Sequence, residues 1–175
     1  MDRVVFLDRD GTINKEITYL HRPRDLVILP GVPQAIRMLR SSGFRIVVVT
    51  NQAGIGRGYY TVEQMHALHR HLNERLKEDG AAIDSFYFCP HHPEHGIGEY
   101  KKTCRCRKPG IGMFEAAEQK YEIDRSRSFM VGDKRIDVEA GHNYGVTGIL
   151  VGTGYGREER EKSRQLGEEP FYDFY

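Results

Sequence analysis

The sequence has almost no net charge, few cysteines and no long apolar run. Its 26 Lys and Arg residues nearly balance 25 Asp and Glu residues, so the formal net charge is only +1. That balance argues against a surface that binds a polyanion such as nucleic acid. No apolar run approaches the length of about 20 residues that crosses a membrane, and Val4–Leu7 is too short for the apolar region of a signal peptide. We therefore expect a cytoplasmic protein with no nucleic-acid or membrane partner.

The three cysteines of the chain all lie between residues 89 and 106. An odd number of clustered cysteines in a cytoplasmic protein is more typical of metal binding than of disulfides. Internal repeats and low-complexity linkers are also absent, and 175 residues are enough for one domain with a substantial core. We therefore expect a single domain over residues 1–175, with the cysteine-containing loop 89–106 inserted in it.

Apolar, β-branched runs alternate along the chain with stretches of helical periodicity. Two helical stripes begin at Val32 and Thr61 and end at Gly43 and Gly80, where glycine stops a helix. Two more helices are predicted at about 113–121 and 136–144. This alternation predicts an α/β fold, a doubly wound (Rossmann-like) parallel sheet of about five strands. The predicted strands are Val4–Leu7, Arg45–Val49, Ser85–Phe88, Ser128–Val131 and Thr147–Val151.

Several smaller features have a structural interpretation. Thr61 and Gln64 have the spacing of a capping box at the start of a helix. On that helix Met65, Leu68, Leu72 and Leu76 form the apolar face, and we expect His66, His69 and His71 to be solvated. The glycine-rich run 54–58 lacks the spacing of a phosphate-binding loop, so we interpret it as a flexible turn. The charged run 157–164 predicts a surface helix, followed by an aromatic tail, 171–175, packed on the body.

The most informative motif follows the first predicted strand, where Asp8 and Asp10 are separated by one residue. Side chains two residues apart on a strand point to the same side, so the two carboxylates should converge at its carboxyl end. Open α/β sheets bind their ligands at that edge. Two acids this close repel each other unless a cation or a shared proton lies between them. The pair therefore indicates metal-assisted chemistry on phosphate.

Other strand ends supply groups that suit the same chemistry. Thr50 and Asn51 follow the second predicted strand, and Asp133 and Lys134 follow the fourth. The long loop after the third strand supplies cations. Carboxylates bind a hard cation, while positive and hydrogen-bonding groups hold phosphoryl oxygens. The residues expected at this edge are Asp8, Asp10, Thr50, Asn51, Arg107, Lys108, Asp133, Lys134 and Asp137.

These motifs, in this order, resemble those of the haloacid dehalogenase (HAD) superfamily of phosphohydrolases. Within it, the runs 6–14, 49–55, 89–93 and 104–109 are similar to the D-glycero-D-manno-heptose-1,7-bisphosphate 7-phosphatase family, which is related to the histidinol-phosphate phosphatases. The resemblance covers residues 4–151. The chain departs from the family pattern at 110–113, where Gly-Ile-Gly-Met follows Lys-Pro.

The resemblance implies a role for each site residue. Asp8 is the expected nucleophile, and the Asp10 side chain the expected acid and base. Mg²⁺ is expected on Asp8, Asp133 and the backbone carbonyl of Asp10. Asp137 either orients Lys108 or a metal-bound water, or is a surface acid. Phosphoryl oxygens are expected on Thr50, Asn51 and Lys108, and substrate recognition on Glu16, Ile17, Thr18, Tyr19, Gln52, Ala53, Gly54, Arg107 and Lys134.

A second metal site is expected in the cysteine loop. Three thiolates and one imidazole make a closed tetrahedral zinc site, which is the structural kind. His91, His92 and His95 are all candidates for the fourth ligand, and the resemblance favours His91. A metal cross-link can order a loop that is too polar to form its own core. Zinc would then also order Arg107 and Lys108. The expected zinc ligands are Cys89, His91, Cys104 and Cys106.

The segment between Asp10 and the helix at Val32 is too short for a large cap domain. By resemblance we expect a monomeric, Mg²⁺-dependent phosphatase that acts through an aspartyl phosphate. It would remove the 7-phosphate of the heptose bisphosphate during synthesis of nucleotide-activated heptose for lipopolysaccharide or S-layer glycan. Histidinol-phosphate phosphatase is the alternative. A nucleic-acid end phosphatase, a phosphoprotein phosphatase or an inactive zinc-binding module are less favoured.

Overall fold

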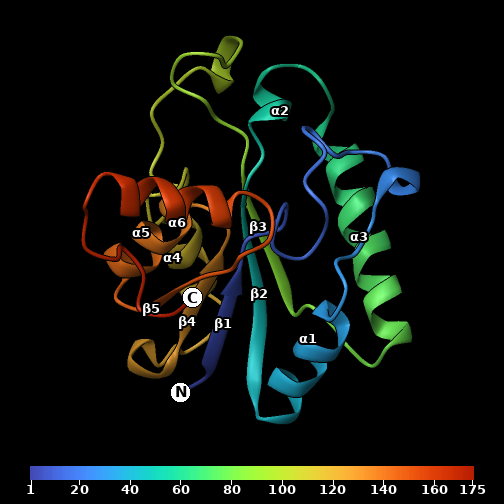
Figure 1. The fold of residues 1–175 in the computed structure, drawn as a ribbon. Coiled ribbons are helices and arrows are strands. Elements are labelled where there is room, and N and C mark those ends of the chain that lie inside the picture. The colour runs from blue at the N-terminus through green and yellow to red at the C-terminus, as the bar shows by residue number, and fades with distance from the viewer.

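Five parallel strands form one sheet in the order β3-β2-β1-β4-β5 (Figure 1). The computed structural model describes residues 1–175. The doubly wound parallel sheet predicted from the sequence is confirmed. The strands are β1 (Arg3–Leu7), β2 (Phe44–Asn51), β3 (Ser85–Cys89), β4 (Phe129–Gly132) and β5 (Thr147–Leu150).

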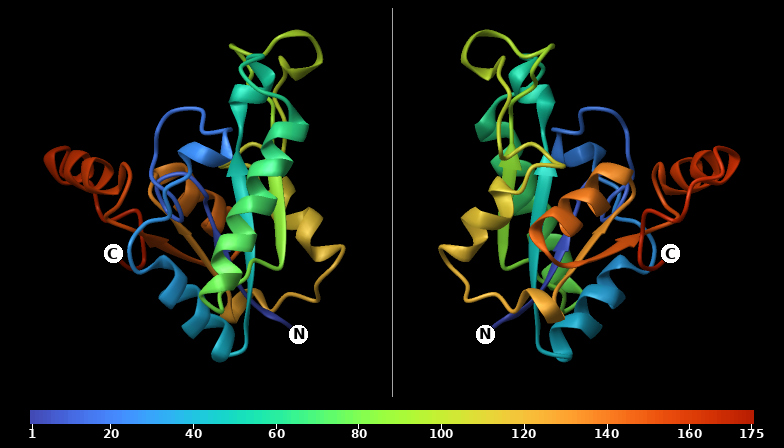
Figure 2. Two further views of the ribbon diagram at one scale, coloured as in Figure 1. Left: turned by 90° about the vertical axis from the view of Figure 1, so that its right-hand side faces the viewer. Right: turned by 90° about the vertical axis from the view of Figure 1, so that its left-hand side faces the viewer.

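Helices cover both faces of the sheet, as the two side views in Figure 2 show. Successive residues of a strand point to opposite faces, so β1 contributes to both halves of the core. Val5 and Leu7 pack with α1 (Val32–Ser41) and α3 (Val62–Glu78). Val4 and Phe6 pack with α4 (Gly112–Glu118) and α5 (Arg135–Tyr144) on the other face.

The strand order reverses between β1 and β4, and this reversal positions the site. The chain passes from β1 outward to β2 and β3, then returns to place β4 on the other side of β1. A crevice opens where the connections diverge, at the carboxyl ends of the strands. Asp8 follows β1 and Asp133 follows β4, so both acids stand at this crevice.

No cap domain separates β1 from α1. That segment contains only one short 3-10 turn, Pro23–Asp25. Two other 3-10 turns lie at Gly98–Tyr100 and Arg125–Arg127. No helix combines the length and the apolarity that a membrane span requires.

Strand β2 is longer than predicted, because its neighbour β3 continues to Cys89. Thr50 pairs with Phe88 and Asn51 with Cys89, so these two polar residues belong to the strand. The ladder holds their backbones rigidly beside the crevice.

Helix α3 begins as predicted, but one of its histidines does not lie where expected. The capping box is present, with Gln64 N donating to Thr61 Oγ1 at 3.2 Å. His69 is only 3% exposed, so the expectation of a solvated side chain is wrong. Position 69 is four residues after Met65 and three before Leu72, which places it on the apolar stripe. The polar character of histidine concealed this spacing.

The glycine run 54–58 forms a packed helical turn, α2 (Ala53–Gly56), rather than the flexible turn predicted. A Cβ on Gly54 would lie 2.2 Å from the ring of Tyr60, and one on Gly56 would lie 2.4 Å from Pro90 O. The glycines are therefore required for close packing.

The charged run predicted as a surface helix is α6 (Gly156–Gln165), which buries only Gly156 and Ser163. The aromatic tail lies along β5, where Leu150 N donates to Phe174 O at 2.9 Å. Phe171 and Tyr172 are half-buried, whereas the Phe174 ring is 61% exposed. The tail thus packs on the body through its backbone and through its rings, since Arg135 lies over Phe171 and Arg160 over Tyr175.

Candidate active site

A cleft of about 330 Å³ opens at the carboxyl edge of the sheet. Its walls come from the ends of β1, β2 and β4, from α2, and from the loops around residues 16–19 and 107–108. The residues that line it are Asp8, Asp10, Glu16, Thr18, Tyr19, Thr50, Asn51, Gln52, Ala53, Gly54, Tyr60, Arg107, Lys108, Lys134, Ile136, Asp137 and Tyr155.

Three buried carboxylates meet at the base of this cleft. Asp8, Asp133 and Asp137 each place an oxygen within 4.8 Å of the other two. Burial disfavours a charged carboxylate, and like charges add to the effect. Burial and the charge of Asp8 raise the pKa of Asp133 to about 7. Burial likewise raises the pKa of Asp137 to about 6, although Lys108 opposes this shift.

Lys108 pairs with two of these acids, Asp8 and Asp137. Its Nζ donates to Asp8 Oδ1 at 2.8 Å and to Val49 O at 2.7 Å, and it lies 2.7 Å from Asp137 Oδ1. All three N–H groups of the ammonium are therefore used. Burial lowers the pKa of Lys108, but the attraction of the two carboxylates outweighs burial and leaves it raised. Asp137 is 1% exposed, so it is not the surface acid that the sequence left open.

Asn51 fixes the backbone of the loop that carries this lysine. Asn51 Nδ2 donates to Lys108 O at 3.2 Å, and Lys108 N donates to Asn51 Oδ1 at 3.0 Å. Both halves of the amide are thus engaged. Thr50 Oγ1 accepts from Gln52 Nε2 at 2.9 Å, and its own O–H remains able to donate into the cleft.

The acids at the base of the cleft fit a divalent cation. Asp133 is fully buried, and its Oδ2 accepts from Tyr155 N at 2.9 Å, while Oδ1 has no hydrogen-bond partner. A buried, unpartnered carboxylate oxygen is costly unless an ion or water occupies the adjacent space. Gly11 and Gly154 pack on the same carboxylate, because a Cβ on either would lie 2.2 or 2.1 Å from Asp133 Oδ2. Clustered carboxylate oxygens are the ligands that Mg²⁺ prefers.

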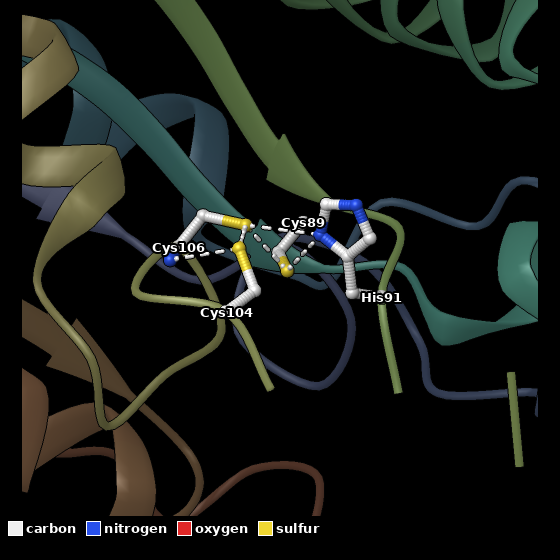
Figure 3. A group of neighbouring side chains, drawn as sticks. All are labelled: Cys89, His91, Cys104 and Cys106. Carbon is white, nitrogen blue, oxygen red and sulfur yellow. Dashed lines mark hydrogen bonds between the residues drawn. The ribbon is translucent and has the colours of Figure 1, made fainter. Parts of the chain in front are cut away.

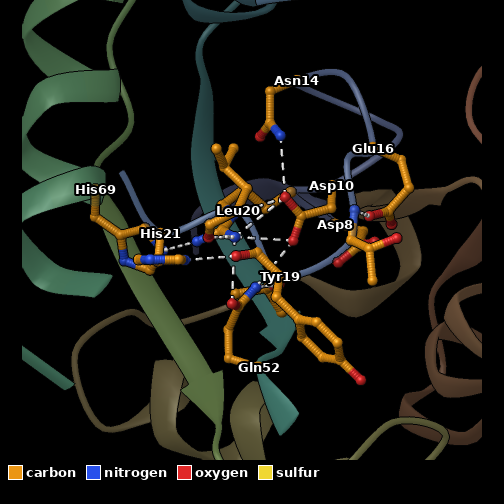
Figure 4. A network of polar contacts seen from close by, with 12 residues as sticks. Asp8, Asp10, Asn14, Glu16, Tyr19, Leu20, His21, Gln52 and His69 are labelled. Atoms are coloured by element: carbon orange, nitrogen blue, oxygen red, sulfur yellow. Dashed lines mark hydrogen bonds and ion pairs between the residues drawn. The ribbon is translucent and has the colours of Figure 1, made fainter. Parts of the chain in front are cut away.

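Asp10 stands at the edge of the cleft inside a polar network (Figure 4). Its carboxylate accepts from Arg9 Nη2 at 2.9 Å, Asn14 Nδ2 at 3.0 Å and Gln52 Nε2 at 3.0 Å. Burial raises the pKa of Asp10, but the charge of Arg9 and these hydrogen bonds outweigh burial and lower it. The side chain is therefore held ionised and in one orientation.

The mouth of the cleft carries charged and aromatic groups. Glu16 Oε2 lies 3.5 Å from Lys134 Nζ, and that ammonium lies 4.9 Å from the centre of the Tyr155 ring. Thr18 and Tyr19 have positive φ angles of 48° and 60°. Such values are uncommon outside glycine and asparagine and often mark functional loops.

Most of the predicted site residues do converge on this cleft. Ile17 does not line it and is 40% exposed, and Asp133 lies behind the lining residues. Three lining residues, Tyr60, Ile136 and Tyr155, were not predicted from the sequence. The aromatic pair before Thr61 was a weak signal for Tyr60. Tyr155 gave none, because only folding brings the loop after β5 against β4.

The cysteine loop brings its four predicted ligands together (Figure 3). Cys106 Sγ lies 2.7 Å from Cys89 Sγ and 3.4 Å from His91 Nδ1, and no disulfide joins the cysteines. His92 and His95 lie outside this cluster, and His92 Nδ1 already accepts from two backbone amides. Three sulfurs and one imidazole fit a structural zinc site.

The same loop is tied to the active-site wall. Ile97 N donates to Gly56 O in α2 at 2.8 Å, and Arg107 Nη1 donates to His91 O at 3.3 Å. Arg107 is adjacent to Cys106 and lines the cleft. The cysteine cluster thus lies beside Arg107 and Lys108, the two cations that this loop contributes to the cleft.

Comparisons with known proteins give consistent results. A family model described as HAD-hydrolase-like matches residues 105–172. The chain is 45% identical over 172 residues to a D-glycero-D-manno-heptose-1,7-bisphosphate 7-phosphatase of Thermosynechococcus vestitus, covering 96% of this chain and 88% of the relative. It is 46% identical over 154 residues to a D-glycero-β-D-manno-heptose-1,7-bisphosphate 7-phosphatase of Haemophilus ducreyi, covering 87% of this chain and 84% of the relative.

A solved structure supports the same assignment. The D,D-heptose 1,7-bisphosphate phosphatase of B. bronchiseptica, complexed with magnesium and phosphate, superimposes with a TM-score of 0.84 at 31% identity. The match covers 99% of this chain and 92% of that one. On these matches, which extend over nearly the whole chain, the protein is a phosphatase of the HAD superfamily and belongs to the D-glycero-D-manno-heptose-1,7-bisphosphate 7-phosphatase family.

Proposed function

We propose that this protein is a Mg²⁺-dependent phosphatase that removes the 7-phosphate of D-glycero-D-manno-heptose 1,7-bisphosphate through an aspartyl-phosphate intermediate. The observation that carries the proposal is the cluster of Asp8, Asp133 and Asp137, two of which pair with Lys108, at the base of a cleft whose edge holds Asp10. The names of the relatives support the choice of substrate.

Asp8 is the nucleophile in this proposal. Lys108 binds Asp8 Oδ1 and so leaves Oδ2 to attack phosphorus. The bond from Asp8 to phosphorus forms as the bond to the sugar oxygen breaks, and one difficult displacement becomes two easier ones. Mg²⁺ held by Asp8, Asp133 and the Asp10 carbonyl would supply positive charge that offsets the repulsion between carboxylate and phosphate.

Asp10 transfers the proton in both half-reactions. It donates to the departing sugar alkoxide, then takes a proton from the water that attacks the aspartyl phosphate. The network around Asp10 favours its ionised form, which is the form that activates water. The charge of a bound phosphate raises the pKa of Asp10 again, because two nearby negative charges disfavour ionisation.

Thr50, through its hydroxyl, and Lys108, through its positive charge, stabilise the phosphoryl oxygens in the transition state, where negative charge spreads over them. Asn51 contributes by holding the Lys108 backbone, through the two hydrogen bonds between them. The cations at the cleft mouth, Arg107 and Lys134, suit the second phosphate of a bisphosphate, and Glu16 suits sugar hydroxyls.

The four ligands at Cys89, His91, Cys104 and Cys106 bind structural zinc in this proposal. The product would feed the synthesis of nucleotide-activated heptose, which is a cytoplasmic pathway. The relatives whose names specify an anomer include both α and β forms, so both anomers belong in the test.

The test measures phosphate release with Mg²⁺ from three substrates under one condition. These are heptose 1,7-bisphosphate as each anomer, histidinol phosphate and a 3′-phosphorylated oligonucleotide. We expect the highest kcat/KM for the heptose bisphosphate, with release of the 7-phosphate only. A higher value for histidinol phosphate would overturn the substrate assignment and leave the phosphatase assignment intact.

A further inference from the structure

His69 is a buried histidine that the proposed mechanism does not use. It belongs to α3, and its ring stacks on Phe86 of β3 with centroids 4.4 Å apart and planes 17° apart. Its Nε2 lies 3.1 Å from Arg9 Nη1, while its Nδ1 is buried without a partner. A buried polar ring with an unsatisfied nitrogen costs stability, so leucine would be the expected residue here if packing alone mattered.

The partner of His69 is a buried arginine that reaches the catalytic acid. Arg9 is 1% exposed, and its Nε and Nη2 both donate to the Asp10 carboxylate. Nη2 also donates to Leu20 O and Gln52 Oε1. His69 is the only acceptor that Nη1 has in the structure. The histidine therefore anchors the end of the guanidinium remote from the Asp10 carboxylate.

The protonation state of His69 follows from this contact. A guanidinium has no acceptor, so Nε2 must accept and the proton must reside on Nδ1. A protonated ring would place a second positive charge 3.1 Å from Arg9. Burial and Arg9 lower the pKa of His69 to about 3. The ring is therefore a neutral acceptor in the working range of an enzyme, and it neither transfers protons nor switches with pH.

We propose that His69 is a positioning residue, which fixes Arg9 and through it the orientation of the Asp10 carboxylate. The inference rests on the proposed role of Asp10 as the acid and base. An arginine side chain has several rotatable bonds, whereas its guanidinium is rigid and planar. Because His69 of α3 holds Arg9 Nη1, the direction in which Arg9 Nε and Nη2 point is fixed. The packing of α3 on β3 therefore helps to set the orientation of the Asp10 carboxylate, the proposed proton-transfer group.

The test compares kcat/KM for two leaving groups in His69→Phe. Phenylalanine keeps the stacked ring and removes the acceptor. A sugar alkoxide needs a proton to depart, whereas p-nitrophenolate does not, and kcat/KM reports the steps up to departure. We expect a loss of about tenfold or more with heptose 1,7-bisphosphate, a part of the ~10²–10⁴-fold that general acid catalysis supplies. With p-nitrophenyl phosphate we expect a loss below about threefold.

Two matched variants are measured beside His69→Phe. His66→Phe changes an exposed histidine of the same helix and should leave both values near those of the wild type. His69→Gln offers an acceptor oxygen near the position of Nε2 and should restore most of the loss. Thermal unfolding and zinc content show whether each variant is folded. If His69→Phe does not fold, Arg9→Lys takes its place. It keeps the positive charge but loses the paired Nε and Nη2 donors to Asp10, and it should show the same selective loss of kcat/KM with the heptose bisphosphate.

Equal losses with both substrates would overturn the inference, because a general structural defect affects both reactions. Asp10→Asn separates this failure from failure of the proposed function. If Asp10→Asn itself lacks the selective loss, the acid role of Asp10 is wrong. If Asp10→Asn shows it and His69→Phe does not, only the inference about His69 fails.

Discussion

Asp8, Asp133 and Asp137 bring three buried carboxylates within 4.8 Å of one another, and the Lys108 ammonium pairs with two of them, Asp8 and Asp137. Lys108 cannot neutralise three carboxylates, and the nearby Lys134 also pairs with Glu16, so the site retains excess negative charge when no metal ion is bound. Protons take up part of this excess, which is the physical reason that the pKa values of Asp133 and Asp137 are raised.

Replacing the nucleophile should abolish turnover without unfolding the protein. In Asp8→Asn the side chain keeps its shape, and Lys108 keeps its ion pair with Asp137. We expect kcat to fall by about 10³-fold or more, with thermal unfolding close to that of the wild type. A folded Asp8→Asn protein that releases phosphate at the wild-type rate would rule out Asp8 as the nucleophile.

The raised pKa of Asp133 predicts an unusual pH dependence for the magnesium-free protein. Its value of about 7, against 3.8 for an ordinary aspartate, means that the folded protein holds a proton that the unfolded chain has released. The free energy of unfolding therefore falls as the pH rises from about 4 to 7. Added Mg²⁺ should stabilise the protein more at pH 7.5 than at pH 5.5, because the cation competes with that proton.

Thermal unfolding between pH 5.5 and 7.5, with and without Mg²⁺, measures both effects. Asp133→Asn is the matched control. It lacks the titrating carboxyl, so its Tm should decline less steeply as the pH rises. Identical pH slopes for the wild type and Asp133→Asn would contradict the assignment of this titration to Asp133.

At the scale of elements, the loop after β3 couples the cysteine cluster to the catalytic cations. Cys106 is followed directly by Arg107 and Lys108, and Asn51 of β2 holds the Lys108 backbone. The loop has one short 3-10 turn and few buried apolar residues. In the proposed function, its order comes from the zinc cross-link and from its contacts with α2.

Losing a zinc ligand should lower activity indirectly. In Cys104→Ser we expect loss of bound zinc and a drop in kcat/KM of about tenfold or more, because Arg107 and Lys108 lose their fixed positions. Zinc content and kinetics are measured on the same preparation. Thr103→Ala changes an exposed neighbour and is the control. It should keep both the bound zinc and the wild-type kcat/KM. A zinc-free Cys104→Ser protein with full activity would show that the cross-link does not order these cations.

The capping box of α3 offers a test at the same scale. Thr61→Ala removes the acceptor of Gln64 N, which should destabilise the protein by about 1 kcal/mol and lower its Tm by about 2–4 °C. Thr61→Ser should retain most of the stability. A Tm for Thr61→Ala equal to that of the wild type would mean that packing alone holds the start of α3.

At the scale of the whole molecule, the carboxyl-terminal tail covers the open edge of the sheet. Asp173 N donates to Gly148 O, Leu150 N donates to Phe174 O, and Asp173 Oδ2 accepts from Gly148 N. Each such bond contributes about 0.5–1.5 kcal/mol. Unpaired sheet edges also favour association between molecules.

Deleting residues 171–175 should therefore lower Tm and promote self-association while retaining most of kcat, because the tail is absent from the cleft lining. Thermal unfolding, light scattering and kinetics measure the three quantities. A truncated protein with the Tm of the full chain would show that the pairing along β5 adds no stability.

Much of the fold could be predicted from local patterns. The five strands, the capped start of α3 and the charged helix α6 are all apparent from hydrophobic or charge patterns and from the residues that cap or end an element. These are properties of neighbouring residues. The two errors have different origins. His69 lies on the apolar stripe of α3, and its polar ring concealed that local spacing. The 54–58 turn was misjudged because Gly56 packs against Pro90, which lies far away in the chain.

The chemical groups of the site can be recognised in the amino-acid sequence alone: an Asp-x-Asp pair after an apolar strand, a lysine after a cysteine cluster, and a distant third acid. Each is a matter of residue identity and short spacing. Only the tertiary structure decided which groups touch. The strand order places β4 beside β1, so Asp133 meets Asp8, and the packing of α3 on β3 brings His69 to Arg9. Such contacts depend on packing between residues distant in the sequence, which local patterns do not encode.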